Sequence, residues 1–255
     1  MKKQLLLLFV IQLIWASSYT VMKIALGEMP FGLILILRYG IASLLFLMAG
    51  QLRLRENFSP REWFLILLVG VINFSGSPYF QLRALELCSA VDASILVAFE
   101  PLLTALIALI LLKERIGWST TLTFFIATVG VLVMNGSLGG DTPIGTLRLW
   151  GNLFFILSLT CEGIYSAASR SLTERHPPLR LIAWMITAGF LASLLAHGSQ
   201  LTMPRLTAIG THGWLAIVYL ALFPSTLCYS VWTFLLKKIP LNRLALSLFL
   251  QPIQG

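Results

Sequence analysis

Residues 5–26 read LLLLFVIQLIWASSYTVMKIAL, an apolar run in which Lys23 is the only charged residue. A helix needs about 20 apolar residues to cross the hydrocarbon core of a bilayer, so this run is long enough. The apolar character continues past the point where a signal peptide would end, which favours an uncleaved first span. Similar runs follow along the whole chain, and they predict further helices at 30–50, 62–83, 90–112, 117–136, 150–171, 179–198 and 212–236. The expected fold class is therefore all-α, a polytopic membrane helical bundle.

The composition agrees with this expectation. Hydrophobic residues make up 58% of the 255 residues and charged residues 11%, whereas a soluble domain carries about 25% charge. The net charge of +8 does not indicate nucleic acid binding, because the basic residues stand singly or in pairs between apolar runs. Short loops of membrane proteins have this pattern.

The positive-inside rule predicts the orientation. With the N-terminus in the cytoplasm, 13 of the 18 basic residues fall on cytoplasmic segments. Only Arg83, Arg148 and Arg205 fall on segments at the outer side of the membrane, while Lys23 and Arg38 lie within spans. The expected location is the cell (plasma or inner) membrane, with multiple passes. The residues assigned to the cytoplasmic side are Lys2, Lys3, Arg53, Arg55, Arg61, Lys113, Arg115, Arg170, Arg175, Arg180, Lys237, Lys238 and Arg243.

The chain also repeats itself. Residues 79–101, YFQLRALELCSAVDASILVAFEP, match residues 230–252, SVWTFLLKKIPLNRLALSLFLQP, at an offset of 151 that places Pro252 on Pro101. A second match places residues 162–170 on residues 15–23 at an offset of 147. The repeating unit is five helices, and because five is odd, the second unit must enter the membrane from the opposite side. Inverted repeats of this kind are common in secondary transporters.

The motifs of both halves resemble a known family. Residues 15–19, WASSY, with Lys23 and then residues 37–39, LRY, resemble the opening of an EamA domain. Residues 100–102, EPL, and 112–115, LKER, are similar to its proline-containing fourth helix and closing turn. Residues 219–252 supply the counterpart in the second half. The chain thus resembles the drug/metabolite transporter superfamily over essentially its whole length.

The resemblance implies ten helices, both termini in the cytoplasm, and transport of amino acids, related metabolites or drugs. We expect a first EamA-like repeat at 1–136, a linking loop at 137–149 and a second, incomplete repeat at 150–255. The ninth helix begins near residue 243 and is cut off at Gly255, and the tenth is absent. A half-span leaves backbone polar groups exposed to lipid. This departure indicates either a truncated product or a partner that supplies the missing surface.

Three charged residues are expected deep in the membrane, where each costs about 2.5–3.5 kcal/mol unless it faces the protein interior. Arg38 and Glu100 reach similar depths at about 1.5 Å per residue. They predict a buried ion pair, serving either the site or the joining of helices. Glu162 has no basic partner at its depth. We predict that it carries a coupling proton or holds a substrate amine, the alternative being a carboxyl group bonded to a neighbouring helix.

Polar and aromatic side chains follow one face of helices 1, 3, 6 and 8, where we expect the substrate. For single residues the alternatives are an interfacial aromatic belt or helix packing through serine. Besides Glu162, Glu100 and Arg38, the candidate residues are Trp15, Tyr19, Asn73, Ser77, Gln81, Tyr165, Tyr229 and Trp232. Prolines are expected to kink corresponding helices near this site, at Pro78, Pro101, Pro224 and Pro252.

We expect neither a cofactor nor a metal site nor enzymatic activity. The chain has no G-x-x-x-x-G-K-[ST] phosphate loop, and its cysteines lack metal-ligand spacing. The leading hypothesis is a secondary active transporter of small metabolites, by family habit an exporter, that works by alternating access with proton coupling. Its expected partners are a small-molecule substrate and the bilayer, while the oligomeric state stays open. The alternatives are a non-transporting membrane subunit and an intramembrane enzyme that modifies lipids or cleaves proteins.

Overall fold

The computed structural model of the chain describes residues 2–52, 57–87, 96–112 and 146–251, together with a few positions between 117 and 129. Within these ranges every regular element is a helix, which confirms the all-α class. Most of the predicted fifth helix at 117–136, most of the linking loop at 137–149, and Pro252 lie outside the described residues.

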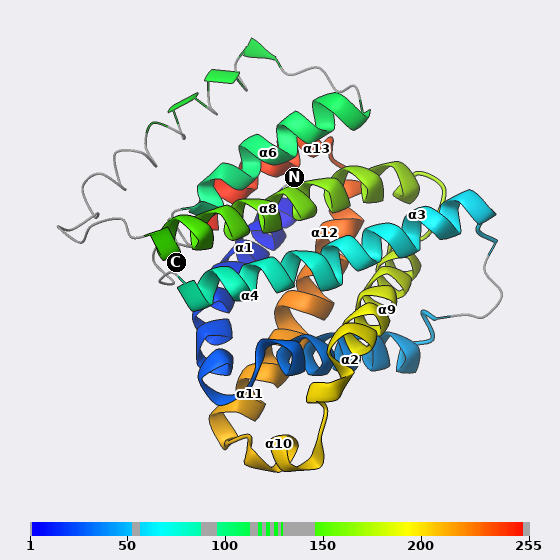
Figure 1. The fold of residues 1–255 in the computed structure, drawn as a ribbon. Coiled ribbons are helices and arrows are strands. Elements are labelled where there is room, and N and C mark those ends of the chain that lie inside the picture. Colours follow the sequence, from blue (N-terminus) through cyan, green and yellow to red (C-terminus); the bar gives the residue numbers. More distant parts are fainter. Residues whose placement is uncertain are drawn as a thin grey trace.

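The first two helices are α1 (Lys2–Glu28) and α2 (Phe31–Met48), and they end within a few residues of their predicted limits (Figure 1). Pro30 separates them in an extended conformation, because a proline restricts its own φ and disfavours a helical conformation in the residue before it. The predicted third helix is α3 (Pro60–Val71), continued without a break by η1 (Ile72–Gly76) and α4 (Ser77–Leu87).

The other predicted helices that fall on described residues are also present. The fourth contains η2 (Val97–Phe99), α6 (Glu100–Ile107) and η3 (Ala108–Leu112). A short helix, α10 (Met203–Ala208), was not predicted. The later elements are α8 (Thr146–Thr173), α9 (Pro178–His197), η4 (Gly198–Gln200), α11 (Thr211–Leu220), η5 (Ala221–Cys228), α12 (Tyr229–Leu236), α13 (Leu241–Ala245) and η6 (Leu246–Leu250).

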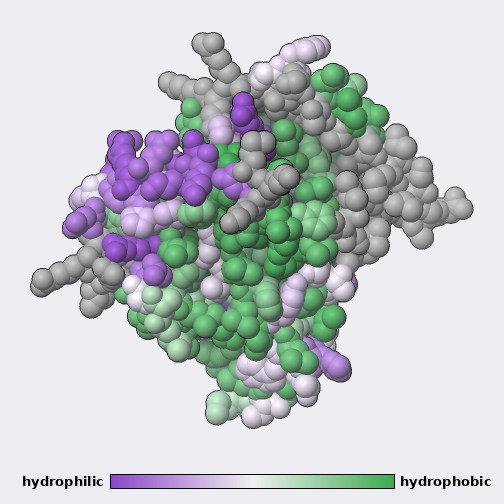
Figure 2. All heavy atoms as spheres, turned by 180° about the vertical axis from the view of Figure 1, so that it is seen from behind, coloured by the Kyte–Doolittle hydropathy of each residue, from purple (hydrophilic) through white to green (hydrophobic). Residues whose placement is uncertain are grey.

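Five of the described helical segments are long and apolar enough to cross a membrane. They are Gln4–Glu28, Phe31–Met48, Pro60–Leu87, Pro178–Gln200 and Thr211–Leu236. The molecular surface carries many exposed Leu, Ile, Val and Phe side chains, and in Figure 2 apolar residues cover much of one face while hydrophilic residues gather towards one end. Lipid can cover such a surface and water cannot. The chain is a multi-pass membrane protein.

Contacts between helix ends define two opposite ends of the bundle. At the first, which we call the Glu62 end, His176 Nε2 lies 3.0 Å from Glu62 Oε1, so the start of α3 meets the turn between α8 and α9. At the second, the Glu28 end, the backbone N–H of Gly210 donates to Glu28 Oε2 at 3.2 Å. The rings of Phe31 and His197 pack there with centroids 5.2 Å apart.

The corresponding helices of the two halves run in opposite directions between these ends. Helix α1 runs toward the Glu28 end and its counterpart α8 toward the Glu62 end. The pair α2 and α9 is opposed in the same way, as are α3–α4 and α11–α12. These directions are the ones that an inverted repeat requires. The inverted two-unit organisation stays a prediction.

The two halves also share local contacts and backbone irregularities. The side chain of Lys23 donates to the carbonyl of Leu85, and Arg170 donates to that of Leu236. The repeat offsets of 147 and 151 place these residues in corresponding positions. The third and eighth predicted helices each contain a π-helical turn, η1 and η5. A 3₁₀ turn precedes both Glu100 and Gln251.

The basic residues are concentrated at the Glu62 end. Among the described positions, only two acidic residues, Glu62 and Glu174, lie in the loops and helix ends there. In the view of Figure 2 this end forms the hydrophilic area. The described basic residues at this end are Arg61, Arg170, Arg175, Arg180, Lys237, Lys238 and Arg243, all of which the sequence assigned to a single side of the membrane.

Two glycines allow α3 and η1 to lie directly against α9. A Cβ on Gly70 would stand 2.5 Å from the backbone oxygen of Met185, and a Cβ on Gly189 would overlap Phe74. Small residues permit this close approach of helices in lipid, where association depends on van der Waals packing.

We expect Gly70→Ala and Gly189→Ala each to lower the free energy of unfolding by about 1–3 kcal/mol, because overpacking forces backbone shifts. Thermal or denaturant unfolding of the detergent-purified protein measures the effect. Gly27→Ala is the control, since no heavy atom lies within 4 Å of a Cβ at that position. Equal stability of all three variants would contradict the close helix contact.

Candidate substrate site

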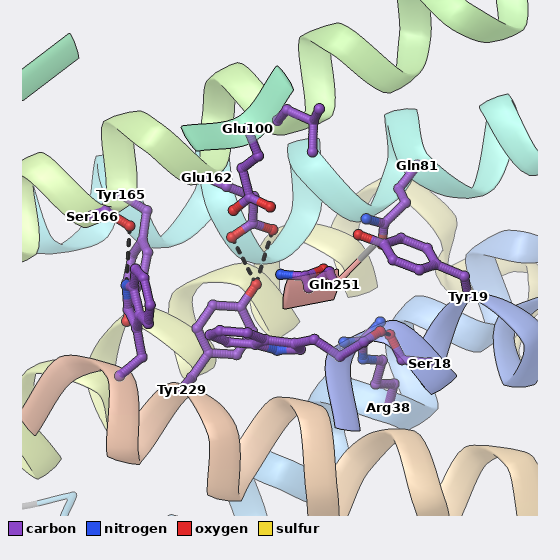
Figure 3. A pocket seen from close by; sticks show the side chains of 13 residues that line it. Ser18, Tyr19, Arg38, Gln81, Glu100, Glu162, Tyr165, Ser166, Tyr229 and Gln251 are labelled. Carbon is purple, nitrogen blue, oxygen red and sulfur yellow. Dashed lines mark hydrogen bonds between the residues drawn. The ribbon is translucent and has the colours of Figure 1, made fainter. Parts of the chain in front are cut away.

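A small polar cavity lies inside the bundle, between helices of both halves (Figure 3). Its volume is about 40 Å³, room for roughly three water molecules. The lining residues are Trp15, Ser18, Tyr19, Arg38, Gln81, Glu100, Leu159, Glu162, Tyr165, Ser166, Tyr229, Trp232 and Gln251. They come from α1, α2, α4, α6, α8 and α12 and from the end of η6.

Most of the candidate residues predicted from the sequence meet at this cavity. The two that do not line it are Asn73 and Ser77, which lie behind Glu162. The candidates on the wall are Trp15, Tyr19, Arg38, Gln81, Glu100, Glu162, Tyr165, Tyr229 and Trp232. The predicted set of helices was too small, because α2 and α6 and the residue after η6 also contribute.

Glu162 is held by hydroxyl groups from two neighbouring helices. The single hydroxyl proton of Tyr229 is shared between the two carboxylate oxygens, at O···O distances of 2.9 and 2.8 Å, and the Ser77 hydroxyl donates to Oε1 at 3.0 Å. Ser77 also lies 3.2 Å from the hydroxyl of Ser158. These donors fix the carboxylate at the cavity wall.

Glu100 lies against Glu162 and not against Arg38. Both carboxyl groups reach the same cavity (Figure 3), close enough for the charge on Glu162 to act on Glu100. The predicted ion pair between Arg38 and Glu100 is wrong: no ion pair joins them in the described structure, where Arg38 Nε donates to Ser225 Oγ at 2.7 Å. The prediction rested on depth alone, and depth does not give the direction of a side chain around its helix.

Arg38 forms the cationic part of the wall. The residue is 4% exposed. Among the described residues its side chain contacts, besides Ser225, two further neutral groups, the sulfur of Met22 at 3.5 Å and the ring of Tyr39 at 5.0 Å. A guanidinium group has five N–H donors. It can therefore bind an anionic group that enters the cavity, and in Figure 3 it lies away from the two carboxylates.

Aromatic rings form the remainder of the wall. Trp15 packs edge-on against both Tyr229 and Trp232, with centroids 5.5 Å apart in each case. The indole N–H of Trp232 donates to Ser166 Oγ at 3.1 Å, and the hydroxyl of Tyr165 lies 2.6 Å from Thr233 Oγ1. The rings are thereby fixed in place, and their faces offer a rigid apolar surface.

Gln251 is the main site residue that the sequence reasoning missed. Its Nε2 donates to Gln12 Oε1 at 2.8 Å, and Gln12 in turn donates to Ser247 at 3.0 Å. The other amide atom, Oε1 of Gln251, is buried without a partner among the described residues. The sequence contained an indication of its role, because the internal repeat aligns Gln251 with the candidate residue Glu100. Ser18 and Leu159 also line the cavity, and neither carried such a signal.

Asn73 is buried beside the site in the π-helical turn η1. It has no solvent exposure. Neither atom of its amide group forms a well-aligned hydrogen bond within the part of the chain described, but the amide lies near enough to Glu162 to interact with that carboxylate. Asn73 is therefore part of the polar surroundings of Glu162.

Three of the predicted prolines coincide with helix irregularities around the cavity. Pro78 follows the wide turn η1, Pro224 lies inside the wide turn η5, and Pro101 stands in the first turn of α6 directly after η2. A proline lacks the N–H that would complete the helical bonding, so the preceding turn widens or breaks.

The described residues contain no group of three or more His, Cys, Asp or Glu side chains arranged to hold a metal ion. The cavity contains two carboxyl groups, Glu100 and Glu162, and the guanidinium group of Arg38. These charged groups suit the binding of organic ions.

A bundle of apolar helices around a charged internal cavity is the arrangement of membrane transporters. The chain belongs to the EamA-like transporter family, which matches residues 2–136 and 149–254. This match confirms the family predicted from the sequence.

Individual proteins with similar sequences are also named as transporters. The uncharacterized transporter YyaM of Bacillus subtilis is 26% identical over 188 residues, which are 73% of this chain and 61% of YyaM; the aligned part is thus less than two thirds of that relative. A probable terminal-alkyne amino-acid exporter of Streptantibioticus cattleyicolor is 25% identical over 244 residues, 93% of this chain and 78% of the exporter. One crystal structure matches with a TM-score of 0.77 at 23% identity, covering 99% of this chain and 85% of that chain, which shows the fold.

We expect Tyr229→Phe to destabilise the protein by about 1.5–3 kcal/mol at pH 8, because the charged carboxylate of Glu162 loses the hydrogen bond from this hydroxyl group. The loss should shrink at low pH, where a protonated carboxyl group no longer needs both donors. Thermal unfolding at several pH values measures this effect. Tyr219→Phe, which removes only an exposed hydrogen bond to Ser17, is the control and should show a small, pH-independent change.

Proposed function

We propose that this protein is a secondary active transporter of small zwitterionic metabolites, amino acids or related compounds, working by alternating access. The observation that carries the proposal is the internal cavity with a carboxylate pair on one wall and a buried, charged Arg38 on another. A molecule with an ammonium group and a carboxylate would satisfy both. Export is the favoured direction, because one relative is named an amino-acid exporter.

The energetics favour a charged substrate over a neutral one. A buried ion without a counter-charge is costly in the low dielectric of a membrane protein. Among the described residues the side chain of Arg38 contacts neutral groups, so a substrate carboxylate would relieve that cost. The edge-to-face rings of Trp15, Tyr229 and Trp232 would contact an apolar side chain of the substrate.

The size of the cavity supports a mechanism in which helices move. Sites for small molecules usually measure about 300–1,000 Å³, far more than the 40 Å³ observed. Loading would therefore require helices to separate. The π-helical turns η1 and η5 lie beside the cavity in corresponding helices, where wide turns can change their bonding at low cost. We propose that units 1–136 and 150–255 move against each other there.

The carboxylate pair suggests how transport is driven. Two carboxylates in contact inside a protein do not both ionise, so the pair holds one proton. Glu162 accepts hydrogen bonds from two hydroxyl groups, those of Ser77 and Tyr229, whereas the described structure gives Glu100 none. We assign the charge to Glu162, which would bind the substrate ammonium group, and the proton to Glu100. Other polar groups that line the same cavity include Tyr19, Arg38, Tyr165 and Gln251.

A substrate ammonium group would then exchange with the proton. When it binds to Glu162, the negative charge is neutralised and Glu100 can release its proton to the side to which the cavity opens. When the substrate leaves, Glu100 takes up a proton again. This cycle would couple outward movement of one cationic group to inward movement of one proton.

Glu162→Gln should reduce counterflow of a labelled amino acid in proteoliposomes at least tenfold, because the ammonium group loses its counter-charge. The substrate is first found by screening a panel of amino acids with the unaltered protein. Glu86→Gln is the matched control: it removes an exposed carboxylate that pairs with Arg83 at the Glu28 end, and surface pairs contribute little. Unchanged counterflow in Glu162→Gln would remove this residue from the mechanism.

Glu100→Gln should keep counterflow within about threefold of the unaltered protein, because Glu162 and Arg38 remain. Accumulation of substrate driven by a pH gradient should be lost, because the amide cannot release a proton. Flux is measured with and without the gradient in the same vesicles. If Glu100→Gln still accumulates substrate in response to the gradient, the proton assignment is wrong while the transport proposal stands.

A further inference from the structure

A second pocket, separate from the central cavity, lies at the basic Glu62 end. Its volume is about 280 Å³. It lies between the first turns of α3 and the last turn of α8. The lining residues are Ser59, Arg61, Glu62, Leu65, Ser171, Leu172 and Arg175. The transport proposal does not use any of them.

The one carboxylate in this pocket is already engaged by the protein. Glu62 Oε2 accepts hydrogen bonds from the backbone N–H and the hydroxyl of Ser59, each at 2.9 Å, which completes the capping box of α3. Its other oxygen lies 3.0 Å from His176 Nε2. Because Glu62 keeps its negative charge, the two neighbouring arginines leave the pocket with one net positive charge.

The two arginines of the pocket are exposed. Arg175 reaches Glu62 only at 3.7 Å, and its side chain is 76% exposed. Arg61 is exposed one residue before Glu62, and the exposed Ser171 adds a hydroxyl group. Two guanidinium groups and a hydroxyl group around one hollow are donors suited to phosphate oxygens.

The floor of the pocket is apolar and continues onto the lipid-facing surface. Leu65 and Leu172 form the floor. One turn along α3, Phe64 and Leu68 are 67% and 41% exposed. A ligand that fits here has an anionic head at the level of the arginines and an apolar portion directed along α3.

We propose that this pocket binds the phosphodiester headgroup of an anionic phospholipid from the surrounding bilayer. The Arg61 and Arg175 guanidinium groups would contact the phosphate, and the acyl chains would lie against the exposed face of α3. The basic character of the whole end attracts anionic lipid to this side of the membrane. A lipid bound here would connect α3 to the turn between α8 and α9, two segments that belong to different halves of the chain.

Thermal unfolding of the detergent-purified chain tests the proposal. Phosphatidylglycerol should raise the unfolding temperature, whereas phosphatidylcholine, a zwitterionic lipid, should not. The shift should be lost in the double variant Arg61→Gln/Arg175→Gln. It should persist in Lys237→Gln/Arg243→Gln, which removes two exposed charges from the same end but outside the pocket. The variant Arg61→Lys/Arg175→Lys keeps the charge and should retain at least part of the shift.

Three outcomes would overturn the proposal. Equal loss of the shift in both double variants would mean that the whole basic surface attracts lipid without a defined site. An equal shift from phosphatidylcholine would mean that the headgroup charge is not recognised. An equal shift from inorganic phosphate, added at the same concentration, would mean that the pocket binds a free anion and not a lipid.

Discussion

The absence of water from the bilayer interior is the constraint on which the structure depends. Every backbone polar group must find its partner inside a helix, so the apolar runs form helices and the prolines leave wide or narrow turns where bonding is incomplete. Every buried charge must face other helices. Arg38, Glu100 and Glu162 therefore turn inward from three different helices and meet at one cavity. The polar site and the apolar exterior are two results of the same requirement.

Much of the fold could be predicted because the same constraint acts on sequence. The length of a span is fixed by the bilayer, and loops must carry polar residues or prolines, so α1, α2 and α9 begin and end near their predicted limits. The short helix α10 was missed because it does not span the membrane and has no periodic apolar signal. The described basic residues at the Glu62 end were assigned to one side of the membrane by letting successive spans alternate in direction. This assignment needs only the number and order of the spans and no knowledge of contacts.

The sequence predicted which residues line the cavity better than it predicted which of them contact each other. Polar residues at helical spacing identify the inward face, which is why Trp15, Glu162 and Tyr229 were found. Spacing along a helix gives depth, but rotation of each helix about its axis depends on packing with neighbours. For this reason the neighbour of Glu100 proved to be Glu162. Gln251 lies in a segment that looks like a truncated span, and only its repeat counterpart indicated a role at the cavity.

The two cation–carbonyl contacts, Lys23 with Leu85 and Arg170 with Leu236, have a mechanical consequence. Each joins the first and third helices of one half, and neither crosses to the other half. Between the halves, Gly70 and Gly189 let α3 and η1 lie directly against α9, and a hydrogen bond from Ser193 Oγ to Ser75 Oγ at 3.0 Å crosses this contact. A displacement of the halves would have to break such side-chain hydrogen bonds, whereas the contacts of Lys23 and Arg170 lie inside one half and would persist. The internal geometry of each half and the contact between the halves thus depend on different residues.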